Sequence, residues 1–246
     1  MPACSATVDD EELSRFAAQA DAWWDPEGSF RALHRLNPTR LDFIRSRLLT
    51  HFRRDARQLR PFLGLTLLDI GCGGGLIAEP MARLGFSVSG IDAGAEAIAA
   101  ARAHARATGL RIDYRIADAE SMAQAGDRFD VVLALEVIEH VADCEVFCRC
   151  LGALASRNGV VIIATLNRTA RSLAFAIVGA EYVLGWLPRG THDWRKFVRP
   201  SELILRLRRN RLTATEIAGI SYNPLSGGWQ LSQDLDVNYV VMAQRR

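Results

Sequence analysis

Two carboxylates and an imidazole lie within a stretch of five residues in the segment LALEVIEHV, which spans residues 133–141. They are Glu136, Glu139 and His140, and they follow the apolar run FDVVLAL. We expect the segment to enter a helix, where positions i, i+3 and i+4 share one face with Cβ atoms about 5–6 Å apart. Such a cluster suits Mg²⁺, Mn²⁺ or Zn²⁺, and without a metal His140 or Glu136 would be the general base. The structural alternative is a set of acids favoured by the dipole at a helix N-terminus.

A glycine loop precedes this cluster in the segment LLDIGCGGG. The pattern predicts a strand that ends at Asp69, followed by Gly71, Gly73 and two further glycines, and then a helix. Glycines let the backbone turn sharply and approach a ligand at the N-terminus of the helix. Asp92 ends the next predicted strand about 20 residues later, where an acid that binds ribose hydroxyls is expected.

Asp69 helps to choose between two ligands for this loop. The spacing of the glycines also allows a dinucleotide, and hence a nicotinamide oxidoreductase. However, a carboxylate directly before the loop would repel a pyrophosphate and would suit the ammonium and sulfonium groups of S-adenosylmethionine. A tight turn beside a solvated Asp92 is the structural alternative.

Short apolar runs alternate with helical patterns from about Leu65 to the C-terminus, which predicts an α/β fold with a mostly parallel sheet covered on both faces. Residues 1–60 read as a helical N-terminal extension that packs on a domain formed by residues 61–246. Within the extension we expect a helix with Asn37 as its N-cap and Pro38 at its first position. Of the last two predicted strands, one is expected to be antiparallel, because only a loop separates them.

The composition restricts the classes of protein that the chain can belong to. Thirty basic and 28 acidic residues give a net charge of +2, which does not indicate a nucleic-acid partner. The five cysteines lack the spacing of a disulfide framework, and we find neither a signal peptide nor a stretch of about 20 apolar residues. We therefore expect a cytoplasmic protein.

One apolar segment, residues 172–188, lies within an insert at about 170–200 and carries a single charge. Two interpretations are open. The segment is expected to form either a helix packed on the domain, or an interfacial helix or lid that contacts lipid and holds the protein at the inner face of the cytoplasmic membrane. The GTHDW segment follows. Its His192 and Asp193 could face the substrate, but a structural turn is the favoured interpretation.

The glycine loop together with the GID segment resembles the class I S-adenosylmethionine-dependent methyltransferases. The resemblance implies a three-layer, Rossmann-like fold with a sheet of seven strands, mostly parallel with one antiparallel. It implies that Gly71 and Gly73 line the methionine end of the methyl donor, that Asp92 binds the ribose, and that Asp118 lies near the adenine.

Further segments, among them WWD, LHRLNPTR and GTHDW, resemble the ubiquinone biosynthesis O-methyltransferases from about Phe16 to Tyr239. This resemblance implies methylation of phenolic hydroxyls on 2-polyprenyl-6-hydroxyphenol and 3-demethylubiquinol, and a place in a complex of ubiquinone-biosynthesis enzymes. It also adds Arg40 and Leu135 to the donor site.

Three other functions stay open at this point. They are a metal-dependent methyltransferase that acts on RNA or a small phenol, a nicotinamide oxidoreductase, and a non-catalytic membrane-associated binding protein. The weak net charge disfavours RNA, Asp69 disfavours the nicotinamide, and the binding protein would leave the glycine loop unexplained.

Overall fold

The computed structural model describes residues 23–28, 30–173, 193–223 and 227–246. Its strands are β1 (Thr66–Ile70), β2 (Ser87–Asp92), β3 (Asp113–Ile116), β4 (Phe129–Leu135), β5 (Ala155–Leu166), β6 (Leu212–Asn223), β7 (Gly228–Ser232) and β8 (Asn238–Arg245). Its helices are α2 (Arg31–His51), α3 (Ala78–Arg83), α4 (Ala95–Ala107), α5 (Ala119–Ala125), α6 (Cys144–Leu154), α7 (Ala170–Ser172), the short 3₁₀ helix η3 (Trp194–Lys196) and α8 (Pro200–Arg209).

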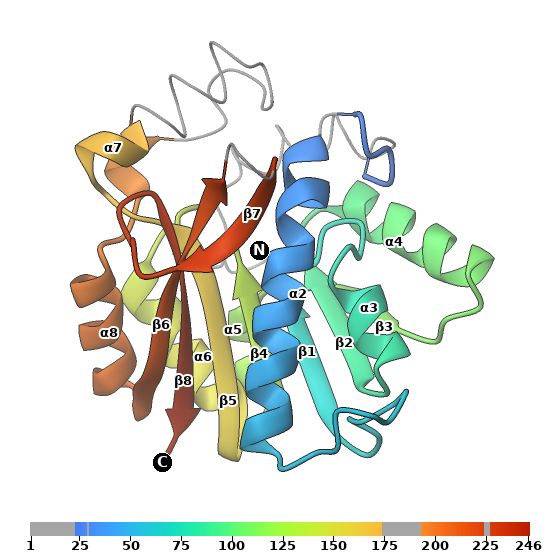
Figure 1. Ribbon diagram of the computed structural model, residues 1–246. Coiled ribbons are helices and arrows are strands. Elements are labelled where there is room, and N and C mark those ends of the chain that lie inside the picture. Colours follow the sequence, from blue (N-terminus) through green and yellow to red (C-terminus); the bar gives the residue numbers. More distant parts are fainter. Residues whose placement is uncertain (1–22, 29, 174–192, 224–226) are drawn as a thin grey trace.

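The described strands form one sheet in the order β3-β2-β1-β4-β5-β8-β6-β7 (Figure 1). The first five are parallel to one another, whereas β8 runs antiparallel to both β5 and β6. The α/β prediction is confirmed, with eight strands in place of the expected seven. The additional strand is β7, which pairs antiparallel with β6 in the region where the sequence indicated only a loop.

Helices cover both faces of the sheet because neighbouring strand residues point to opposite sides. Leu67 on β1 belongs to a buried cluster with residues of α2, α3 and α4, whereas its neighbour Leu68 belongs to a second cluster with α5, α6 and α8. On β4, Val131 belongs to the first cluster and its neighbour Val132 to the second. This arrangement gives the predicted three layers.

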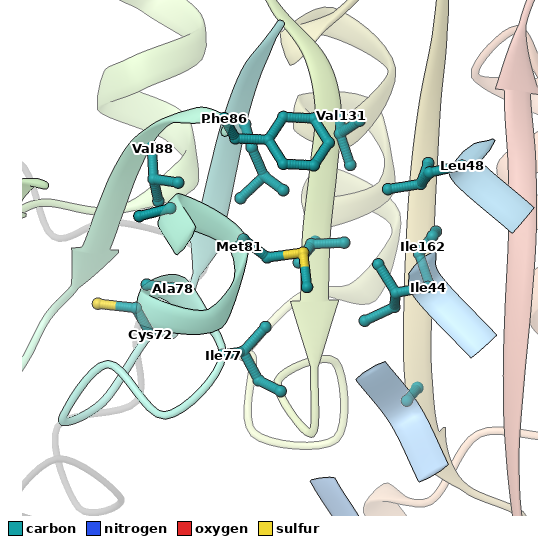
Figure 2. Close-up of a cluster of buried hydrophobic side chains, with 14 of the residues drawn as sticks. Ile44, Leu48, Cys72, Ile77, Ala78, Met81, Phe86, Val88, Val131 and Ile162 are labelled. Atoms are coloured by element: carbon teal, nitrogen blue, oxygen red, sulfur yellow. The ribbon is translucent and has the colours of Figure 1, made fainter. Parts of the chain in front are cut away.

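Helix α2 lies across one face of the sheet and contributes to its main core. Figure 2 shows Ile44 and Leu48 of α2 beside Ile162 of β5, with Met81 of α3 next to them. All four side chains are fully buried. The helical segment is therefore part of the packing that holds the strands in place.

The predicted N-cap at Asn37 is wrong. The helix begins at Arg31, seven residues before Pro38, so Pro38 lies inside it. The side chain of Asn37 is buried and accepts a hydrogen bond from Arg40 Nη1 at 3.4 Å, so it does not cap the helix. A proline can lie in a helix interior when packing outweighs the one hydrogen bond that it removes.

The chain crosses from one side of β1 to the other between β3 and β4, so β1 and β4 are neighbours. In open α/β sheets a ligand binds outside the carboxyl ends of the strands at such a switch point. The register pairs Ile70 with Ala134 and also with Ile91. The loops that follow β1, β2 and β4 therefore meet at one edge of the sheet.

Candidate active site

The glycine loop turns directly after β1 and needs glycine at two of the predicted positions. Gly71 has φ +67°, and a Cβ there would lie 2.5 Å from Cγ2 of Val137 in the loop after β4. Gly73 has φ +50°, and a Cβ there would lie 2.3 Å from Cη2 of Trp23. The loop is thus closed on one side by the segment after β4 and on the other by the N-terminal segment. The sequence analysis missed Trp23, although the WWD segment contains it.

Asp92 ends β2 and holds two loops together. Its Oδ2 accepts a hydrogen bond from Gly73 N at 2.9 Å, and its Oδ1 accepts one from Gly94 N at 2.8 Å. Burial raises the pKa of this carboxyl, although the two backbone hydrogen bonds lower it in part. The structure therefore brings Asp92 to the glycine loop, and its binding of ribose stays a prediction.

Asp69 lies beneath the loop at the end of β1 and is 3% exposed. Burial and the nearby charge of Asp92 raise its pKa to about 7. Its Oδ2 has no hydrogen-bond partner among the described residues. A cationic ligand in the loop would stabilise the ionised form of this acid, because opposite charges attract strongly in a buried site.

The segment after β4 is a turn and not the predicted helix. Glu136 has φ +55°, Ile138 to His140 form a turn, and the helix α6 begins only at Cys144. The reason is that Glu136 N still pairs with the strand β5, donating to Ala164 O at 2.9 Å. A left-handed residue at that point bends the chain before a helix can start.

The turn is held by a buried ion pair between Arg40 of α2 and Glu136 (side chains 3% and 19% exposed). This contact joins the first described helix to the carboxyl end of β4. It places Arg40 beside the carboxyl end of β4, where its guanidinium is paired with Glu136, and its contact with the donor stays a prediction. Its Nε is buried with no partner among the described residues.

Glu139 is also buried in the turn, where its Oε2 accepts a hydrogen bond from Thr165 Oγ1 at 2.8 Å. Burial and the neighbouring Glu136 raise its pKa well above the usual value. Its Oε1 has no hydrogen-bond partner among the described residues. Carboxylate oxygens are the ligands that a hard divalent cation prefers, and a cation here would have to displace the proton that the raised pKa of Glu139 retains.

The full three-residue metal cluster, however, does not form as the helical spacing implied. Within the described ranges, no three His, Cys, Asp or Glu side chains are grouped closely enough to hold a metal ion. The structure brings Glu136 and Glu139 together. A cation site that includes His140 stays a prediction.

The structure describes three of the four remaining predicted residues. Leu135 is the last residue of β4 and is partly buried. Asp118 caps α5, since its Oδ1 accepts from Ser121 N at 2.7 Å. Asp193 caps the short helix η3 by accepting from Arg195 N at 2.9 Å, whereas His192 lies outside the described residues.

A comparison with known proteins identifies the family. A family model described as a methyltransferase domain matches residues 34–217. A ubiquinone biosynthesis O-methyltransferase from Paramagnetospirillum magneticum is 54% identical over 235 residues, which cover 96% of this chain and 94% of that protein. The chain belongs to the ubiquinone biosynthesis O-methyltransferase family. A relative of the same name from Parvibaculum lavamentivorans is 54% identical over 243 residues, covering 99% of this chain and 96% of the relative.

As a member of the ubiquinone biosynthesis O-methyltransferases, the chain is an enzyme that uses S-adenosylmethionine for O-methylation. Solved structures agree on the fold. The magnesium protoporphyrin IX methyltransferase from Synechocystis, solved with bound S-adenosylhomocysteine, superimposes with a TM-score of 0.64 at 18% identity, covering 96% of this chain and 94% of the other. A possible histamine N-methyltransferase from Thermotoga maritima gives 0.64 at 15% identity, covering 96% and 99%.

The predicted apolar segment 172–188 lies outside the described residues, apart from its first two positions. No helix in the described part of the chain has the length and apolarity needed to cross a membrane.

Proposed function

We propose that this enzyme methylates phenolic hydroxyls of polyprenylated ubiquinone precursors, namely 2-polyprenyl-6-hydroxyphenol and 3-demethylubiquinol. The observation that carries the proposal is the similarity to two relatives named for O-methylation in ubiquinone biosynthesis. Each is 54% identical to this chain over nearly its full length. The strand-end cluster of Gly71, Asp92 and Leu135 supports it, because it offers one site for the donor next to the turn that would meet the phenol.

In this mechanism the phenol oxygen attacks the methyl carbon of S-adenosylmethionine in line with the sulfur. The new O–C bond forms as the S–C bond breaks, and S-adenosylhomocysteine leaves with the electron pair. Gly71 and Gly73 let the backbone approach the methionine part, Asp92 accepts from the ribose hydroxyls, and Asp118 lies near the adenine. Holding the two reactants in line supplies much of the acceleration.

The phenol must also lose its proton, since a free phenol titrates at about pH 10 like tyrosine. We assign the proton acceptor to His140, which follows the buried Glu139 in the turn after β4. Its side chain is partly exposed, and its backbone N–H donates at 2.9 Å to the carbonyl of Val137, the residue that lies next to Gly71 of the glycine loop. A general base at this position is expected to contribute about 10²–10⁴-fold in rate.

A divalent cation is the alternative to a protein base at this turn. Glu136, Glu139 and His140 would have to draw together around it, since they are not grouped closely enough in the described structure, and a phenol oxygen bound to it would lose its proton more readily, as metal-bound water does. Protein stripped with EDTA should lose activity and regain it with Mg²⁺ or Zn²⁺. Glu139→Ala should weaken the metal more than the donor, whereas Thr165→Val keeps the carboxylate and should keep the metal response. Full activity of verified metal-free protein would contradict this part.

The substrate assignment has its own test. Purified enzyme and S-adenosylmethionine are incubated with short-chain forms of the two polyprenyl substrates, with an unprenylated small phenol and with RNA. We expect methyl ethers, detected by mass spectrometry, on the two prenylated compounds. Methylation of RNA or of the small phenol alone would favour the metal-dependent alternative.

We further propose that the enzyme works in the cytoplasm and reaches its lipid-soluble substrate through residues 172–188, at the membrane surface and in contact with other enzymes of the pathway. An apolar segment with one charge suits an interfacial position. Wild-type protein should float with liposomes, and a variant with charges at Ile177 and Leu184 should float less. Absence of lipid-dependent flotation of the wild type would count against this proposal.

We also propose that residues 1–60 form an N-terminal extension and that residues 61–246 form the methyltransferase domain.

A further inference from the structure

Two tryptophans at the start of the described chain lie directly on the glycine loop. A Cβ at Gly73 would meet Cη2 of Trp23 at 2.3 Å, and a Cβ at Gly74 would meet Cγ of Trp23 at 2.5 Å. The indole therefore covers two consecutive glycines. Glycine is required there because a side chain from a distant segment occupies the adjacent space.

Several contacts fix this segment, which we call the tryptophan strap (Trp23 and Trp24). Trp24 donates from Nε1 to Gly74 O at 2.9 Å, and its ring stacks on His104 with 3.5 Å between centroids. The ring of Trp23 stacks on Phe30 at 3.7 Å. The strap is thus docked by both of its residues on the loop that follows β1.

The two indole N–H groups differ in one respect. Trp24 Nε1 has its partner in the loop, whereas Trp23 Nε1 is buried and has no hydrogen-bond partner among the described residues, in a side chain only 9% exposed. Buried tryptophan N–H groups usually find a partner, since leaving one unpaired is costly. This N–H group therefore points to an acceptor that the described chain does not supply.

The acceptor that the chemistry favours belongs to the methyl donor. The ring lies on Gly73, whose backbone N–H holds Asp92, so it stands at the site where the donor is expected. The α-carboxylate of S-adenosylmethionine needs hydrogen-bond donors, and Arg40 is already paired with Glu136. We propose that the Trp23 indole N–H donates to the α-carboxylate of the bound methyl donor, with the ring as one wall of its site. This inference rests on the use of S-adenosylmethionine by the enzyme.

Two conservative variants test this assignment against a purely structural one. Trp23→Phe keeps an aromatic ring on the glycines but removes an N–H that is unpaired in the free protein. Both tryptophan variants lose packing from the smaller ring, but Trp23→Phe should lower the melting temperature without donor less than Trp24→Phe does. Trp24→Phe removes a satisfied N–H, so its melting temperature should fall.

Calorimetric titration then compares two ligands. S-adenosylhomocysteine should bind Trp23→Phe roughly 3- to 10-fold more weakly than wild type, as expected for one hydrogen bond. 5′-Methylthioadenosine lacks the carboxylate and should bind both proteins equally. An unchanged or tighter affinity of Trp23→Phe for S-adenosylhomocysteine would overturn the proposal, as would an equal loss for both ligands. Failure of the wild type to bind S-adenosylhomocysteine would overturn the methyl-donor assignment itself.

A spectroscopic measurement on the wild type keeps the proposal testable if Trp23→Phe does not fold. In protein labelled with ¹⁵N at the indole nitrogens, the Trp23 N–H signal is identified by elimination against the other Trp→Phe variants. It should move downfield when S-adenosylhomocysteine is added and stay in place with 5′-methylthioadenosine. A signal that does not respond to S-adenosylhomocysteine would contradict the hydrogen bond.

Discussion

Arg40, on the first described helix, forms a buried ion pair with Glu136 at the carboxyl end of β4. The two residues are 96 positions apart in the chain. The pair joins α2 to the turn that carries Glu139 and His140, next to the glycine loop. The geometry of the turn therefore depends on a helix that precedes the first strand.

This pair should contribute to stability, because removing one partner leaves the other charge in a largely buried place. Arg40→Met is expected to lower the free energy of unfolding by about 3 kcal/mol. A double-mutant cycle with Glu136→Gln, measured by urea denaturation, should give a coupling of at least about 1.5 kcal/mol. The exposed pair of Arg115 and Asp113 is the control, with a coupling below about 1 kcal/mol. Equal coupling for both pairs would refute the buried contact.

Gly71 should tolerate alanine only if Val137 is shortened. Gly109 has a similar φ of +69° with nothing within 4 Å of an added Cβ, so Gly109→Ala reports backbone strain alone, about 1 kcal/mol. Gly71→Ala should cost about 1–3 kcal/mol more, because its Cβ would meet Val137 Cγ2 at 2.5 Å. Adding Val137→Ala should recover much of that difference in thermal unfolding. Equal costs for the two single variants would show that the contact is unimportant.

Asp69 should make donor binding depend on pH. An aspartate in the unfolded chain has a pKa of about 3.9, whereas burial and the nearby charge of Asp92 raise the pKa of Asp69 in the folded protein to about 7. The folded protein thus holds more protons between these values, and this residue's contribution to stability falls as pH rises through the window. A cationic donor favours the ionised acid, so its binding should release a proton and tighten toward pH 8.

Calorimetry in buffers of different ionisation enthalpy measures that proton. Near pH 6.5 the wild type should release more protons on binding S-adenosylmethionine than Asp69→Asn does. Because the amino group of the donor also titrates, the difference between the two proteins is the informative quantity. Identical proton release by both would mean that Asp69 does not ionise with the donor.

His140 should affect the chemical step and not the binding of the donor. His140→Gln is expected to lower kcat by at least about 100-fold, with the affinity for S-adenosylhomocysteine within about twofold of wild type. Raising the pH toward about 10, where the phenol ionises unaided, should recover part of the loss. A variant with normal kcat, or one that mainly loses donor affinity, would remove His140 as the proton acceptor.

The sequence predicted the parts of the site that follow from local pattern. Asp69 and Asp92 each follow a short apolar run, which predicts a position at the end of a strand. The run of glycines predicts a sharp turn, because glycine adopts the positive φ angles that such a turn requires. What could not be predicted depends on distant contacts. The left-handed Glu136 arises from pairing with Ala164 on β5, which no local rule contains.

Two further differences have the same origin. Pro38 indicated a helix start, yet the packing of Ile44 and its neighbours against the sheet extends the helix back to Arg31. Trp23 carries no local signal of a site residue, since its position on Gly73 depends on the folded loop. Tertiary packing thus outweighs local propensity at the places where the site is assembled.

The central claim, that the enzyme places a methyl group on a phenolic oxygen, is tested most directly with S-adenosylmethionine carrying a ¹³C-labelled methyl group. The purified enzyme is incubated with a short-chain 3-demethylubiquinol, and the product is followed by NMR. We predict a ¹³C signal at the shift of an aryl methyl ether, one equivalent of S-adenosylhomocysteine for each ether, and loss of both in Asp92→Ala. Label on carbon or nitrogen, or no transfer by protein that binds the donor, would contradict the account.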